Sequence, residues 1–218
     1  MKYLYRTGAA FVSSRLGIRD IPPISAESLN MRNSTTGGLI IAGSYISKTT
    51  SQLKSLRVRR ASKLYVVELP VAKLIQSSEE SARIVNIAIE DASQRLQSGQ
   101  DVLIMTSRDL VVGKDAISSL RIGGLVAATL VKVMLSIEVR PRYIIAKGGI
   151  TSSDIATKGL NMKRAMVVGQ AERGVPLWRC DEETSRHRGV PYVVFPGNVG
   201  DDDTLAELVE RWALPESR

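Results

Sequence analysis

The stretch YIIAKGGITSSD, Tyr143–Asp154, decides the fold because it joins an apolar strand to a glycine turn and a helix start. Tyr143–Ala146 is typical of a buried strand, and the pair Gly148-Gly149 lets the backbone approach an anion closely. The Thr, Ser and Asp residues that follow can begin a helix, whose first amide groups and positive dipole end attract negative charge. The stretch therefore predicts a phosphate-binding turn at the end of a strand.

Runs rich in Val and Ile recur along the chain, each bounded by Gly, Pro, Ser or charged residues, and they predict strands buried on both faces. These runs are Leu39–Ala42, Leu64–Leu69, Val102–Met105, Tyr143–Ala146, Ala165–Val168 and Val190–Phe195. Helices are predicted at Thr50 to about Ala61, Ser78–Leu96, Ala116–Ile137 and from Asp201–Asp203 to Trp212. The alternation predicts an α/β fold with a mostly parallel sheet and helices on both faces, a Rossmann-like three-layer sandwich.

Residues at the ends of the predicted helices have the types and spacing of helix caps. Ser77 with Glu80, and Thr49 with Gln52, have the spacing of a capping box. Gly99 stands where the residue after a helix is often glycine. The helix through Leu125–Leu135 is apolar almost all round, so we expect it to be central.

Composition limits the classes of function. With 218 residues, 44% of them hydrophobic and 24% charged, the chain is an ordinary globular protein in composition, and we expect no continuous apolar run long enough to cross a membrane. Arg6 and Arg15 interrupt the opening segment, which predicts no secretory signal and a cytoplasmic location. One cysteine and one histidine exclude an intrachain disulfide and a His/Cys metal cluster. We assign His187 no catalytic role and expect Cys180 to be a small core residue.

The formal net charge of +8 predicts a surface that attracts anions. Only two Phe residues are present and aromatic residues do not alternate with basic ones, which argues against a nucleic-acid surface. Arg57, Arg59, Arg60 and Lys63 close a helix and are expected on its solvated face.

The chain divides into two segments. Residues 1–35 combine a helical opening, the extended piece Ile21–Ile24 and a polar stretch, which is typical of a linker. Residues 36–218 carry all the predicted strands and form the expected domain.

Three predicted strands end in small and polar residues that could bind a ligand, since ligands of such sheets bind beyond the carboxyl ends of the strands. The candidate residues are Ser44 and Thr49 after the first strand, Lys147, Gly148, Gly149, Ile150 and Thr151 after the fourth, and Gly197, Asn198 and Gly200 near the C-terminus. If the turns meet, their amides and hydroxyls suit the phosphates and ribose of a nucleotide. The alternative for each turn is ordinary turn and cap chemistry. Neither GxxxxGK[ST] nor GxGxxG is present.

Carboxylates near these turns are candidates for Mg²⁺, which needs only one or two of them beside a nucleotide. Asp201 and Asp202 are one choice and Asp154 is the other. The alternative for Asp201–Asp203 is a cap at a helix start. Lys147 could place its ammonium group on a phosphate, or could simply be solvated.

Five blocks in order resemble the C-terminal nucleotide-binding domain of the four-carbon acid sugar kinases. The blocks are GSYISKTTSQLKSL at Gly43–Leu56, LIMTSRDL at Leu103–Leu110, IIAKGGITSSDIATKGL at Ile144–Leu160, RAMVVGQAERGVPLW at Arg164–Trp178 and PYVVFPGNVGDDDTL at Pro191–Leu205. The resemblance covers roughly residues 36–212 and implies an ATP-dependent, Mg²⁺-dependent kinase that phosphorylates the terminal hydroxyl of tetronic acids. It implies ATP contacts at Ser44, Gly148–Thr151 and Gly197–Gly200.

The resemblance also implies that two domains bind the two substrates. Leu4–Val12 is similar to the segment that ends the N-terminal sugar-acid domain of the family, so residues 1–30 resemble a hinge and the acceptor-binding domain with its acidic motif is missing here. The sugar acid would reach the nucleotide through that domain, and a homodimer is conceivable through the orphaned helix. The alternative function is a non-catalytic nucleotide-binding or interaction module. A nucleic-acid binder would rest on net charge alone.

Overall fold

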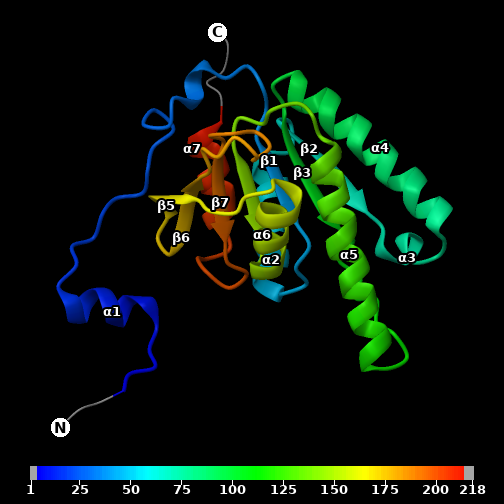
Figure 1. The fold of residues 1–218 in the computed structure, drawn as a ribbon, viewed down its shortest axis with the longest axis horizontal. Coiled ribbons are helices and arrows are strands. Elements are labelled where there is room, and N and C mark those ends of the chain that lie inside the picture. Colours follow the sequence, from blue (N-terminus) through cyan, green and yellow to red (C-terminus); the bar gives the residue numbers. More distant parts are fainter. Residues whose placement is uncertain (1–3, 214–218) are drawn as a thin grey trace.

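The computed structural model describes residues 4–213, without the side chains of residues 9, 10 and 32. A single sheet with helices on both sides makes up the body of the molecule (Figure 1). The strands are β1 (Leu39–Ala42), β2 (Leu64–Leu69), β3 (Asp101–Thr106), β4 (Ile144–Lys147), β5 (Met166–Glu172), β6 (Val175–Arg179) and β7 (Pro191–Phe195). The helices are α1 (Ala9–Leu16), η1 (Met31–Asn33), α2 (Ser47–Arg59), α3 (Val71–Leu74), α4 (Ser78–Gln97), α5 (Ala116–Ser136), α6 (Gly149–Asp154), the π-helix η2 (Ile155–Gly159) and α7 (Thr204–Trp212).

The sheet has seven strands in the order β2-β3-β1-β4-β7-β6-β5. The pairings among β2, β3, β1, β4 and β7 are parallel, and β6 and β5 add an antiparallel edge. The predicted α/β class with a mostly parallel sheet is confirmed. The prediction that the run at Ala165–Val168 is buried on both faces is wrong, because β5 is an edge strand and its Met166 and Val167 are 66% and 62% exposed. It is also wrong for Leu64–Leu69, because β2 is the opposite edge strand and its Glu68 is exposed.

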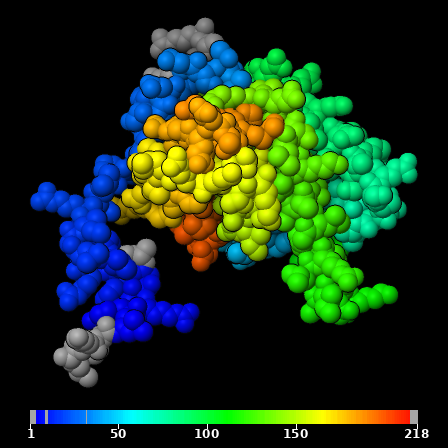
Figure 2. All heavy atoms as spheres, viewed as in Figure 1, coloured from blue at the N-terminus to red at the C-terminus, as the bar shows by residue number. Residues whose placement is uncertain are grey.

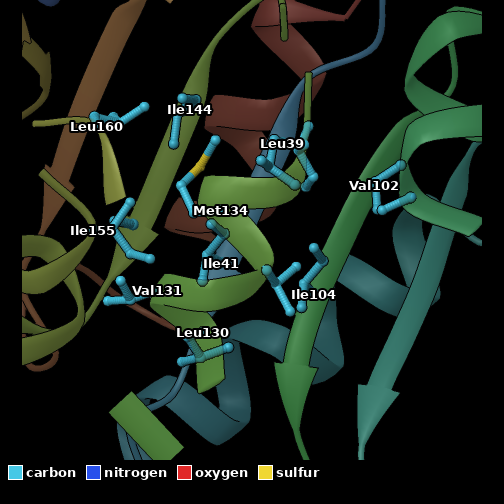
Figure 3. Packing of buried hydrophobic residues seen from close by; sticks show 14 of the residues in the cluster. Leu39, Ile41, Val102, Ile104, Leu130, Val131, Met134, Ile144, Ile155 and Leu160 are labelled. Carbon is cyan, nitrogen blue, oxygen red and sulfur yellow. The ribbon is translucent and has the colours of Figure 1, made fainter. Parts of the chain in front are cut away.

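Alternate residues of the central strand β1 pack on opposite faces of the sheet, as the strand period of two requires. Leu39 and Ile41 belong to the cluster formed with α4, α5 and η2 (Figure 3). Ile40 and Ala42 belong to the cluster formed with α2 and α7. Helices therefore cover both faces, which is why these strands read as continuous apolar runs.

Local helix signals were mostly correct. The Ser77 hydroxyl accepts the amide of Glu80 at 3.1 Å, but the Glu80 carboxylate pairs with Arg83, so only one half of the predicted capping box forms. Gly99 has the positive φ of 86° expected after a helix. The start of α5 has a cap that the sequence reading did not name: Asp115 accepts the amide of Ser118 at 2.7 Å.

Helix α5 is only half central. Its buried residues, among them Leu130, Val133 and Met134, lie in the C-terminal half, whereas Ile117 and Leu120 are 66% and 77% exposed. By length and composition α5 could cross a membrane, although Arg121 and Lys132 interrupt its apolar residues, and 33% of its most apolar window is buried. One such helix is weak support for a membrane span, because core helices of globular proteins pass the same test. The exposure of Leu120 has a local explanation, given below.

The N-terminal segment stands away from the body of the molecule (Figures 1 and 2). Its helix α1 ends at Gly17, whose φ is 64°. The segment reaches the sheet at Ile24, whose amide donates to the carbonyl of Gln170 in β5 at 2.8 Å. Residues 1–3 and 214–218 of the two predicted segments lie outside the described residues.

A buried charge cluster closes the amino-terminal edge of the sheet. Asp101 accepts the amide of Gly38 at 2.8 Å and the guanidinium of Arg142 at 2.6 Å, and Arg60 lies 3.4 Å from its second oxygen. Asp101 and Arg142 are 3% and 4% exposed, so this cluster fixes three chain segments without facing solvent.

Candidate functional site

The first and second predicted turns meet at the carboxyl edge of the sheet. β1 and β4 are neighbours and their last residues, Ala42 and Lys147, are paired, so the chain leaves both strands at the same level. A Cβ added to Gly148 would lie 3.0 Å from the Cβ of Ser44. Gly148 has a φ of 108°, which other residues rarely adopt, so glycine is required here both by conformation and by this close approach.

The third turn joins the same place because β7 lies next to β4. The amide of Gly148 donates to the carbonyl of Phe195 at 2.8 Å. A Cβ on Gly197 would lie 3.8 Å from the Ser44 hydroxyl. The structure therefore brings the three turns together around Ser44.

Thr49 and Gln52 do not form the predicted capping box. Helix α2 begins at Ser47, after Ile46, and has no side-chain cap, so both residues lie inside the helix. The Thr49 hydroxyl donates to the carbonyl of Gly197 at 3.3 Å, and the Gln52 amide donates to the carbonyls of Val199 at 3.0 Å and Asp201 at 2.6 Å. These two buried side chains hold the third turn against α2.

Lys147 is fully buried and also holds the third turn. Its ammonium group donates to the carbonyls of Pro196 at 2.6 Å and Gly197 at 3.4 Å and lies 4.1 Å from the centre of the Phe195 ring. Burial, with a smaller contribution from the charge of Lys48, lowers the pKa of Lys147 to about 7. Neither alternative considered from the sequence, a direct phosphate contact or a solvated side chain, describes this placement.

A cavity of about 730 Å³ opens between α5 and the first two turns. Its polar side contains Ser44, Gly148, Gly149, Thr151 and Asp154. The rest of its wall comes from α5 and from the turns, namely from Leu120, Gly123, Gly124, Val126, Ala127 and Leu130 of α5 and from Gly43, Tyr45, Ile46 and Ile150 of the turns. The exposed Leu120 in the first half of α5 is thus part of the cavity wall, whereas Ile117 is not.

Six predicted site residues line this cavity and the others do not. Those that line it are Ser44, Gly148, Gly149, Ile150, Thr151 and Asp154. Those that lie elsewhere are Thr49, Lys147, Gly197, Asn198, Gly200, Asp201 and Asp202. The third turn therefore packs against the first turn without lining the cavity itself.

The α5 wall was missed by sequence reasoning. The clue was Gly123-Gly124 inside a helical pattern, which weakens a helix and has no explanation in a core. A Cβ on either glycine would meet no atom within 4 Å, so the helix faces open space there.

The polar side offers donors that suit an anion. The amides of Gly149, Ile150 and Thr151 open a helix and have no partner within it. A Cβ on Gly149 would meet nothing within 4 Å, so the space beside this residue is open. This half of the cavity fits a phosphate group.

The three predicted metal carboxylates have different surroundings. Asp154 lies at the cavity and pairs with Lys158 at 2.7 Å. Asp201 accepts the Thr204 hydroxyl at 2.7 Å and the amides of Thr204 and Asp203 at 2.9 and 3.1 Å, and these bonds, led by the hydroxyl, lower its pKa. Asp202 pairs with Lys48 at 3.1 Å. Within the described part of the chain no three His, Cys, Asp or Glu residues form a group that could hold a metal by themselves.

Comparison with known proteins gives a family and a fold. The family described as the nucleotide-binding C-terminal domain matches residues 39–205. A Bordetella bronchiseptica structure of a domain of unknown function (DUF1537), a domain-swapped dimer with bound citrate, is 18% identical with a TM-score of 0.62 over 85% of this chain and 44% of that chain. A Haemophilus influenzae DUF1537 protein is 18% identical with a TM-score of 0.58 over 92% of this chain and 45% of its own. The chain thus spans less than half the length of these structures, and no curated protein matches it.

Proposed function

Because the chain belongs to the family of nucleotide-binding C-terminal domains, we propose that its cavity binds ATP with Mg²⁺ as the donor half of a kinase that phosphorylates the terminal hydroxyl of a four-carbon sugar acid. Nucleotide binding itself follows from the family. The identity of the nucleotide, the metal, the acceptor and the transfer step are the proposal.

The observation that carries the proposal is the two-sided chemistry of the cavity. The apolar wall of α5 suits a base, while the glycine turns at Ser44 and Gly148–Thr151 present amides and hydroxyls to phosphates. The cavity of about 730 Å³ is within the range of small-molecule sites.

Asp154 is the residue that would hold Mg²⁺ at this cavity. It is the one candidate carboxylate among the cavity-lining residues, and Mg²⁺ beside phosphates needs only one or two protein carboxylates. The ion would neutralise phosphate charge. Asp154 would have to exchange its ion pair with Lys158 for this role.

Phosphoryl transfer depends on placing the acceptor hydroxyl in line with the terminal phosphate. The solved relatives are more than twice as long as the part that this chain spans, and the sequence resemblance places the acceptor site in an N-terminal domain. The bound citrate of the Bordetella protein is a hydroxy acid, which agrees with an acidic acceptor. In this proposal the chain positions the donor, and a domain outside these residues positions the acid.

Nucleotide binding without transfer is the second candidate, favoured by the fact that Asp154, the one candidate carboxylate at the cavity, is already paired with Lys158. Two measurements separate the candidates. Titration calorimetry with ATP, with and without Mg²⁺, should show binding that Mg²⁺ strengthens. Release of ADP with threonate or erythronate, after addition of the N-terminal domain of a relative, should show transfer.

Absence of any ATP, ADP or GTP binding would overturn the proposed site, whereas binding without ADP release would favour the second candidate. For the metal, Asp154→Asn should remove most of the effect of Mg²⁺ on ATP affinity. Asp20→Asn is the matched control, because Asp20 makes a similar 2.7 Å ion pair, with Arg173, on the N-terminal segment.

A further inference from the structure

Arg108 holds the first turn of the site in place. It follows β3, next to β1 in the sheet, and its Nη2 donates to the carbonyl of Ser44 at 2.6 Å and to the hydroxyl of Thr50 at 2.7 Å. One nitrogen thus ties the end of β3 to both the turn and the start of α2. Sequence reasoning gave Arg108 no role.

The hold on the Ser44 carbonyl fixes the direction of the next amide. All described peptide bonds are trans, so the N–H of Tyr45 points to the side opposite the Ser44 carbonyl, away from Arg108. The amide of Ile46 is already taken by the Ser44 hydroxyl at 3.3 Å, whereas no acceptor in the described part of the chain meets the amide of Tyr45. Ser44 and Tyr45 both line the cavity, so this turn presents a free donor there.

The charge of Arg108 is not neutralised by the protein. Its Nε and Nη1 are buried and have no hydrogen-bond partner, and the ring of Tyr45 lies 5.5 Å from its Cζ. Burial lowers the pKa of Arg108, partly offset by Tyr45 and by Glu68, an exposed residue that forms no ion pair with it. A guanidinium group remains charged in proteins, so a half-buried cation stands beside the cavity without a carboxylate partner.

We propose that Arg108 is a positioning residue for a phosphate group: it turns the Tyr45 amide toward the bound anion, and that anion balances its charge. The inference rests on the proposed nucleotide site and adds a residue and a specificity to it. A ligand with a phosphate group at the Ser44 turn would accept a hydrogen bond from the Tyr45 amide and be attracted by the charge of Arg108. A nucleoside without phosphates would make neither interaction.

Calorimetry with ATP and with adenosine tests this, using the full chain and the variants Arg108→Ala, Arg108→Gln and Arg108→Lys. Arg108→Ala should weaken ATP binding by about 10- to 100-fold, as for loss of a hydrogen bond to a charged group, and leave adenosine binding unchanged. Arg108→Lys should recover part of the loss, because it keeps the charge and one donor. Arg108→Gln should recover less, because it keeps only a donor.

Arg186→Ala is the matched control. Arg186 also donates from Nη2 to a backbone carbonyl, that of Ile137, at 3.4 Å and has a buried Nε without a partner, yet it does not line the cavity. It should change the affinity for neither ligand. Thermal unfolding shows that each variant is folded.

The outcomes separate this inference from the proposed function. Wild-type protein that binds no nucleotide ends both. Wild-type protein that binds ATP, with an Arg108→Ala variant that is folded and binds ATP equally well, overturns the role of Arg108 and leaves the nucleotide site standing. An equal loss of ATP and adenosine affinity would show a general structural role and would also overturn the inference.

Discussion

The ammonium nitrogen of Lys147 lies 2.6 Å from the carbonyl oxygen of Pro196, and no ion pair with a carboxylate is found for it among the described residues. A buried cation held only by carbonyl groups is destabilised by its own desolvation. In the folded protein this favours loss of the proton.

Lys147 should therefore make stability depend on pH. Its pKa is about 7 in the folded chain against 10.5 for an ordinary lysine, so between these values the unfolded state binds more protons and the free energy of unfolding rises with pH. Compared with Lys147→Met, wild-type protein should gain stability as the pH increases through this window. Urea unfolding at several pH values measures the difference, and parallel curves for the two proteins would contradict the assignment.

Gly148→Ala should reduce ATP affinity by about 10-fold or more, because a methyl group would lie 3.0 Å from the Cβ of Ser44 and the φ of 108° is strained for alanine. The two turns would have to separate. Gly189→Ala is the control: its φ of 74° is also positive, and its Cβ would come no closer than 3.4 Å to another residue, away from the cavity. Equal ATP affinity for Gly148→Ala and wild type, measured by calorimetry, would count against this turn as the phosphate site.

Gly124→Leu should change stability and binding in opposite directions. Glycine within a helix is less favourable than other residues by up to about 1 kcal/mol, so the variant should melt at a higher temperature. A Cβ here meets no atom within 4 Å, and a leucine side chain would fill space of the cavity and weaken nucleotide binding. Gly124→Ala gives the helix effect with little filling, so its melting temperature should rise with a smaller loss of affinity. Unchanged affinity of Gly124→Leu would show that the ligand does not lie against α5.

Asp101→Ala should destabilise the protein by about 3–5 kcal/mol, because it leaves Arg142 buried without its partner. ATP affinity of the folded fraction should not change, since the cluster lies at the amino-terminal edge of the sheet. Asp20→Ala removes an ion pair whose side chains are 79% and 74% exposed, and should shift stability by less than about 1 kcal/mol. Urea unfolding of the two variants compares them directly, and equal small losses would show that the buried cluster contributes little.

The sheet could be predicted from the sequence because its central strands are buried on both faces. The central strand Leu39–Ala42 was predicted with the bounds that the structure shows, and so was the edge strand Leu64–Leu69. The turn at Gly148 could be predicted because paired glycines directly follow an apolar strand, although the same residues also suit an ordinary turn or cap. The position of β5 at the edge of the sheet could not be predicted from the sequence, because the run containing Met166 and Val167 is as apolar as a central strand.

The remaining errors concern contacts between distant segments. Thr49 and Gln52 have the residue types of a cap, but the same groups bind carbonyls nearly 150 residues away, at Gly197 and Val199. Nothing local in the sequence distinguishes these two uses. The wall at Leu120 and the contact of Arg108 with Ser44 likewise depend on how α5 and β3 lie beside β1.

Helix α5 begins beside an open cavity and ends inside the core. Hydrogen exchange at its amides should therefore be fast in the first turns and slow around Val133 and Met134, within one continuous helix. A ligand seated against Gly123 and Gly124 would slow exchange along the cavity wall and leave exchange at Val133 and Met134 unchanged. The slow end of the same helix then serves as an internal reference against which occupancy of the cavity can be read.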